Sequence, residues 1–79
     1  MDTKIIISPE AVAAALKRQV MSSKDLSRRM KTSEGYISKL LAQIDEGAGL
    51  TPNMTRKLAR ALKVEPIDIM AEAAKAAQS

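Results

Sequence analysis

The residues of this 79-residue sequence that are best suited to bind a partner lie on one polar face of a predicted helix. Within residues 32–43, the apolar residues Ile37, Leu40 and Leu41 recur at helical spacing, which predicts a short helix with an apolar underside. The opposite face presents hydrogen-bonding side chains and one glycine, namely Glu34, Gly35, Tyr36, Ser38, Lys39 and Gln43. A face of this kind can recognise a polar partner through hydrogen bonds.

The composition excludes several classes of catalytic and metal site. With no histidine and no cysteine, the sequence rules out zinc sites, imidazole acid–base catalysis and disulfides. It also lacks a glycine loop that could cradle phosphates and a clustered set of carboxylates. We therefore expect a protein that is not an enzyme and that binds no metal, cofactor or small-molecule ligand.

The sequence also predicts a cytoplasmic location. The absence of cysteine suits a reducing compartment. No apolar run approaches the ~20 residues that span a bilayer, and residues 5–7 are too few for the apolar core of a signal peptide.

Positive charge is concentrated around the polar face. The formal net charge is +4, and residues 17–43 contain seven basic residues against Asp25 and Glu34, a local charge of +5. The remainder of the chain therefore sums to −1. A polyanion is the natural partner of such a segment, although basic residues that only solvate a surface are the alternative.

The elements that must position this face are helices. The sequence predicts a compact, all-α domain over residues 1–79, because hydroxyl residues and prolines mark repeated helix starts. The predicted helices span residues 9–20, 22–30, 33–43, 52–62 and 66–79. Residues 1–7 include three consecutive isoleucines and predict an extended arm, which must pack on the domain or pair with a second copy.

The second and third predicted helices meet the geometric demands of a helix-turn-helix, whose second helix enters the major groove of DNA. Two helices that cross steeply need a small residue where their backbones approach, and Ser27 supplies it. They also need an apolar corner, which is provided by Leu26, Met30, Ile37 and Leu40.

The same residues carry a family resemblance. Residues 22–30 and 32–40 resemble the Cro/phage-repressor (Xre-type) helix-turn-helix family, and residues 58–66 are similar to that family's fourth helix and the start of its fifth. The family usually has alanine at the position of Ser27 and glycine at the position of Lys31. We therefore expect Lys31 to adopt a left-handed conformation at some cost.

The resemblance implies roles for individual residues. It places Glu34, Gly35, Tyr36, Ser38 and Lys39 at base edges and Ser23, Lys24, Ser33, Gln43 and Asn53 at phosphates. Lys39 would donate to guanine and Glu34 accept from cytosine, although Glu34 could simply stabilise a helix N-terminus and Ser23 simply flank a cap. Gly35 costs ~1 kcal/mol in a helix relative to alanine, which favours a close backbone approach. Arg28, Arg29 and Lys31 are expected to add to the field rather than to make contacts.

The sequence is compatible with two different dimer elements and with two different functions. Two copies would meet through Ile67, Met70, Ala74 and Ala77, or through Ile5, Ile6 and Ile7, and would read half-sites ~34 Å apart on a palindromic operator. The first function is a homodimeric DNA-binding repressor of phage or plasmid type. The second is an antitoxin that binds a toxin partner and represses its own promoter, since Xre-type antitoxins share this fold and residues 49–54 resemble their segment before the fourth helix.

Overall fold

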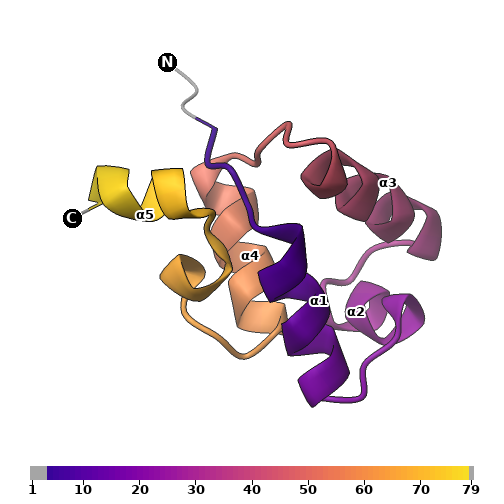
Figure 1. The fold of residues 1–79 in the computed structure, drawn as a ribbon. Coiled ribbons are helices and arrows are strands. Elements are labelled where there is room, and N and C mark those ends of the chain that lie inside the picture. The colour runs from indigo at the N-terminus through magenta and orange to yellow at the C-terminus, as the bar shows by residue number, and fades with distance from the viewer. Residues whose placement is uncertain (1–3, 79) are drawn as a thin grey trace.

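The protein consists of short helices packed around one core (Figure 1). The computed structural model describes the backbone of residues 4–78 and the side chains of residues 4–76. The elements are α1 (Pro9–Arg18), α2 (Ser23–Arg29), α3 (Glu34–Asp45), α4 (Pro52–Ala61), the 3₁₀ helix η1 (Pro66–Ile69) and α5 (Glu72–Gln78). The prediction of an all-α, five-helix domain with a short extended segment before it is confirmed.

Hydroxyl side chains cap the first four helices, in agreement with the hydroxyl residues that mark helix starts in the sequence. The Oγ atoms of Ser8, Ser22 and Ser33 and the Oγ1 atom of Thr51 each accept a hydrogen bond from the backbone N–H three residues later, at 3.1–3.2 Å. These bonds satisfy N–H groups that have no partner within the helix. Proline at the first helical position adds to the start signal in α1 and α4.

Three helices end on a residue with left-handed backbone that is not glycine. Val20, Lys31 and Lys63 have φ angles of 50°, 55° and 57° and follow α1, α2 and α4. After α2, for example, the N–H groups of Lys31 and Thr32 donate to the carbonyls of Arg28 and Ser27, which is the Schellman pattern. The left-handed conformation costs such residues roughly 1–2 kcal/mol. The prediction for Lys31 is confirmed, whereas α1 ends at Arg18, before the predicted Val20.

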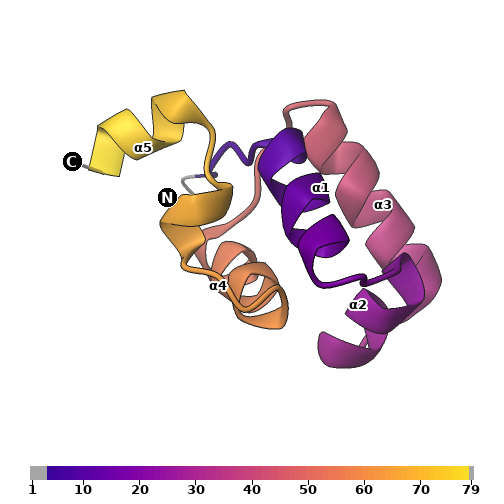
Figure 2. The ribbon, with the colours of Figure 1, turned by 60° about the horizontal axis from the view of Figure 1, so that its bottom comes forward.

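The corner between α2 and α3 is built as predicted. Leu26, Ile37 and Leu40 are buried, and Met30 packs against them from a partly buried position. Ser27 is buried as well, and its hydroxyl donates to the Lys24 carbonyl at 2.7 Å. In Figure 2, α1 and α3 lie side by side with α2 across their lower ends.

The N-terminal arm is bound to its own domain on both edges. Ile5 and Leu50 exchange two backbone hydrogen bonds, of 2.6 and 2.8 Å. On the other edge, the Ile6 carbonyl accepts from Ala71 at 2.9 Å, and Ile7 forms a bridge with Met70. The sequence leaves two possibilities for the arm, packing on the domain or pairing with a second copy. For the residues described, the arm packs on the domain. Residues 1–3 lie outside the described part.

This packing corrects part of the expected dimer surface. Ile7 is 1% exposed and Met70 is 7% exposed, so both side chains belong to the core of the protomer and are not available to a second copy. Ile6 and Ile67 are exposed, whereas Ile5 and Ala74 are partly buried. The side chain of Ala77 lies outside the described residues.

The predicted last helix is broken. Residues 66–79 do not form one helix, because Met70 has an extended backbone (φ −76°, ψ 146°) between η1 and α5. The N–H of Ala71 donates to Ile6, and Ser8 donates to the Ile69 carbonyl at 2.8 Å. Pairing with the arm thus replaces helical hydrogen bonds at this point, which the local sequence alone does not signal.

None of the helices described between residues 4 and 78 has both the length and the apolar composition needed to cross a membrane.

Candidate nucleic-acid interface

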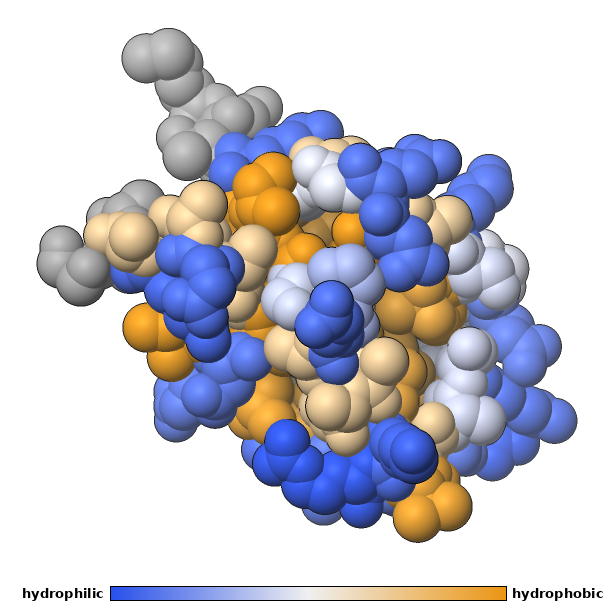
Figure 3. All heavy atoms as spheres, viewed as in Figure 1, coloured by the Kyte–Doolittle hydropathy of each residue, from blue (hydrophilic) through white to orange (hydrophobic). Residues whose placement is uncertain are grey.

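Helix α3 has one buried side and one side that the described chain leaves uncovered. Its inner side is held in the core by Ile37, Leu40 and Ile44. The predicted base-reading residues and Gln43 are all exposed, on a helix of twelve residues or about 18 Å. Hydrophilic and weakly polar residues predominate over the edge of the molecule where α2 and α3 lie (Figure 3). The face is therefore fixed from below and free to meet a partner from above.

The exposed residues form three rows, because residues four or seven apart lie on the same side of a helix. Gly35 and Lys39 form the middle row, opposite the buried side chains. The row facing α4 holds Tyr36 and Gln43, and the third row holds Glu34 and Ser38. A partner that lies along the middle row can reach side chains of both flanking rows.

Tyr36 connects this face to α4 and to the arm. Its side chain is 39% exposed, and its hydroxyl donates to the Met54 sulfur at 3.8 Å. Tyr36, Gln43 and Lys4 line one hollow of about 170 Å³, together with the α4 cap Thr51. Tyr36 thus lies partly against α4, and it has to exchange a weak sulfur acceptor for any phosphate or base that it contacts.

Lys4 is a candidate that sequence reasoning missed. The sequence predicts an extended arm, but the arm's partner Leu50 is 45 positions away, so no local signal places Lys4 beside the third helix. Close packing holds it there, since a Cβ built on Gly49 would lie 3.2 Å from the Lys4 Cβ. The arm therefore brings a cation next to Tyr36 and Gln43.

The predicted phosphate contacts are distributed around α3 rather than gathered at one point. Ser23 is the first residue of α2 and is partly buried, whereas the next residue, Lys24, is exposed. Ser33 caps α3, and its hydroxyl accepts from Tyr36 N–H at 3.1 Å, which leaves its own hydrogen free to donate. Asn53 is exposed at the second position of α4. These groups therefore come from α2, α3 and the start of α4.

Gly35 is not required by the fold of the free chain. A Cβ added there would meet nothing within 4 Å, and its φ angle is not in the left-handed range. The space above Gly35 is therefore open to a partner that approaches the backbone of α3.

The positive charge flanks α3 instead of lying on it. Helix α3 carries Lys39 against Glu34 and Asp45. The neighbouring elements are more basic, since α4 and the residues directly after it hold Arg56, Lys57, Arg60 and Lys63 with no acidic residue before Glu65. On α2, the Ser22 backbone N–H and hydroxyl hold the pKa of Asp25 below its ordinary value, and the charges of Arg28 and Arg29 act in the same direction.

Comparison with family models, curated proteins and solved structures finds no match to this chain, so the geometry around α3 carries the functional inference. Among the described residues, no group of acidic side chains is arranged to bind a metal ion.

Proposed function

We propose that the protein is a sequence-specific transcriptional regulator of the Cro/phage-repressor type, which binds double-stranded DNA by placing α3 in the major groove. One observation carries the proposal. Helix α3 is anchored by three buried side chains while its opposite face, with its hydrogen-bonding residues, stays uncovered directly after the turn from α2. A major groove about 12 Å wide admits one such helix.

The rows on α3 assign the contacts. Lys39, in the middle row, donates to guanine, and Glu34, on the flank, accepts from cytosine. Ser38 hydrogen-bonds either base, and Tyr36 contacts a thymine methyl or a phosphate. Ser23, Lys24, Ser33, Gln43 and Asn53 bind phosphates on both sides, which fixes the register of α3 without reading sequence.

The proposed active form is a cytoplasmic homodimer that represses by occupying promoter DNA. Its contacts are the exposed residues Ile6 and Ile67 (47% exposed) and the partly buried Ala74, since Ile7 and Met70 are core residues. Two copies would meet a palindromic operator with half-sites ~34 Å apart. A sedimentation mass of 8.5 kDa at high protein concentration would contradict the dimer.

The test of the function is duplex binding with a charge-matched control. A preferred sequence is first selected from a pool of random duplexes, and affinities are then measured for the selected and a random duplex by fluorescence anisotropy. Lys39→Ala should reduce the discrimination between the two by ~1–3 kcal/mol. Tyr36→Ala should reduce it as well if Tyr36 contacts a thymine methyl, whereas an equal loss of affinity for both duplexes would mean that Tyr36 contacts a phosphate. Lys75→Ala, which removes the same charge from α5, should leave the discrimination unchanged. No duplex binding at low salt would refute the function.

A further inference from the structure

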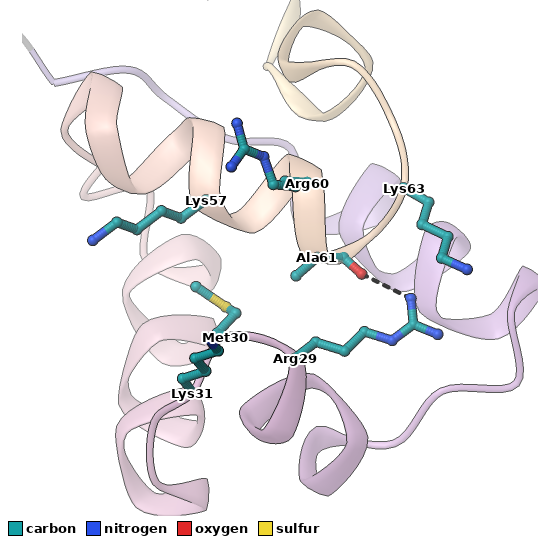
Figure 4. A pocket seen from close by; sticks show the side chains of 7 residues that line it. All are labelled: Arg29, Met30, Lys31, Lys57, Arg60, Ala61 and Lys63. Atoms are coloured by element: carbon teal, nitrogen blue, oxygen red, sulfur yellow. Dashed lines mark hydrogen bonds between the residues drawn. The ribbon is translucent and has the colours of Figure 1, made fainter.

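A groove rimmed by cations lies between the C-terminal ends of α2 and α4 (Figure 4). This α2–α4 groove has a volume of about 380 Å³, and its rims hold Arg29, Lys31, Lys57, Arg60 and Lys63. Met30 and Ala61 lie between the rims and give the groove an apolar floor. None of the acidic residues that the structure describes lines it.

The groove assembles cations that the sequence separates. Lys57, Arg60 and Lys63 belong to the part of the chain that sums to −1, because Glu65, Asp68 and Glu72 follow them. In the fold those acids belong to η1 and α5 or directly precede them, and none lines the groove. Within the described residues the recorded ion pair joins Lys75 to Glu72 instead of any rim residue. Four of the rim cations are therefore available to a partner, namely Lys31, Lys57, Arg60 and Lys63, whereas Arg29 donates to the Ala61 carbonyl and the Gln19 side chain.

Two of the rim lysines occupy left-handed backbone positions. Lys31 and Lys63 follow the ends of α2 and α4 with φ angles of 55° and 57°, where glycine is the favoured residue. The helix dipole stabilises a cation at a helix C-terminus, but this stabilisation is smaller than the free-energy cost of the left-handed conformation. Strained residues that meet in one groove point to a use for their side chains.

The floor of the groove selects against a small buried anion. The Ala61 carbonyl, at the end of α4, accepts from Arg29 at 3.1 Å, and the neighbouring Leu62 carbonyl accepts from the Gln19 side chain. These carbonyls mark the negative end of the α4 dipole, which repels an anion placed deep in the groove. Cations on two opposite rims suit an extended polyanion that crosses the opening.

The groove is connected along the chain to the proposed DNA surface. Lys31 is two residues before Ser33, the cap of α3, and Lys57 is one helical turn after Asn53 on α4. An acidic segment of a protein would not need this connection, whereas the backbone of a bound duplex would make use of it.

We infer that the α2–α4 groove binds the sugar–phosphate backbone of the same duplex that α3 reads. Lys31, Lys57, Arg60 and Lys63 donate to phosphate oxygens, and Arg29, held by the Ala61 carbonyl, adds a fixed positive charge. This extends the expected role of Lys31 from field to contact. The inference rests on the proposed function, and it concerns affinity for any duplex rather than choice of sequence.

The test uses a variant that removes two rim charges without disturbing the turns. Lys31→Gly combined with Lys63→Gly keeps backbone that glycine adopts readily. Affinity for the selected and the random duplex is measured against salt concentration. The slope of log affinity against log salt should become shallower by roughly 1.8, from ~0.9 for each lost contact, and by the same amount on both duplexes.

Two controls separate the groove from general effects. Val20→Gly relieves the same left-handed strain after α1, outside the groove, and Lys17→Ala with Arg18→Ala removes two charges from the last turn of α1. Both should leave the slope unchanged. Lys57→Gln with Arg60→Gln, on the opposite rim to Lys31, should repeat the reduced slope and tests the groove if the glycine variant does not fold.

The outcomes distinguish this inference from the proposed function. If the wild type binds duplex DNA but both rim variants keep its slope, the groove inference fails and the function stands. If the wild type binds no duplex at low salt, the proposed function fails first. If the rim variants lose binding to a polyglutamate peptide while their DNA slope is unchanged, the groove binds an acidic protein segment and the inference is overturned.

Discussion

Helices α3 and α5 both expose a face, but only α3 is anchored. Three side chains of α3 are buried in the core, whereas none of the described side chains of α5, residues 72–76, is buried. Figures 1 and 2 show α5 leaning away from the other helices. An exposed face therefore has a different structural origin in the two helices. On α3 the exposed face lies opposite three buried side chains that fix the helix in the core, whereas on α5 it reflects how few of the described side chains pack there.

The largest expected effect is on the free energy of unfolding, to which α3 should contribute much more than α5. Ile37→Ala should lower the free energy of unfolding by ~2–5 kcal/mol, because it leaves a cavity in the core under α3. Deleting residues 72–79 should lower it by less than ~1 kcal/mol, since a short helix with no buried side chain among residues 72–76 adds little. Urea unfolding followed by circular dichroism measures both. Losses of equal size would mean that α5 is anchored as firmly as α3.

The next effect concerns the backbone before each helix. Lys31→Gly should raise the free energy of unfolding by roughly 1–2 kcal/mol, because glycine adopts the left-handed turn before α3 without strain. Met70→Gly, before α5, should be destabilising instead, since Met70 has no left-handed strain to relieve and its side chain is buried. Thermal unfolding of the two variants gives the comparison, and destabilisation by Lys31→Gly would show that its side chain has a structural role.

The sequence predicts α3 much better than it predicts α5. The Ser33 cap and the spacing of Ile37 and Leu40 are local signals, and they place the start of α3 and its corner with α2 correctly. Helix α3 nevertheless continues to Asp45, two residues beyond its predicted end. The break at Met70 depends on pairing with the arm, and the position of Lys4 depends on the bridge between Ile5 and Leu50. Both result from contacts between distant parts of the chain. The α2–α4 groove cannot be predicted from the sequence for the same reason, because its cations come from separate parts of the chain.

A smaller effect tests whether a partner approaches α3 closely. Gly35→Ala should raise the free energy of unfolding by ~0.5–1 kcal/mol, because alanine is the better helix former and its Cβ meets nothing within 4 Å. The same methyl group should weaken duplex binding if DNA approaches the backbone of α3. Ala73→Gly, in α5, makes the reverse change away from the interface and should not affect duplex binding. A more stable Gly35→Ala variant with unchanged DNA affinity would remove Gly35 from the contact surface.

The smallest effect is a pH dependence at the start of α2, the helix against which α3 packs. The Asp25 carboxylate accepts from the Ser22 backbone N–H and hydroxyl, each at 3.0 Å, and these bonds hold the pKa of Asp25 below its ordinary value. A depressed pKa in the folded state means that the stabilising effect is complete above the unfolded pKa of ~3.9 and is lost as pH falls through the lower, folded value.

Asp25→Asn should therefore be less stable than the wild type at neutral pH, and the difference should shrink as the solution is acidified below pH ~3.9. Asparagine keeps the shape of the cap but lacks the charge, so the comparison isolates ionisation. The chain without residues 72–79 should keep the same pH dependence, because α5 takes no part in this cap. Urea midpoints for the three proteins across the acid range measure the effect. A difference between wild type and Asp25→Asn that stays constant with pH would mean that the Ser22 bonds do not depend on the charge of Asp25.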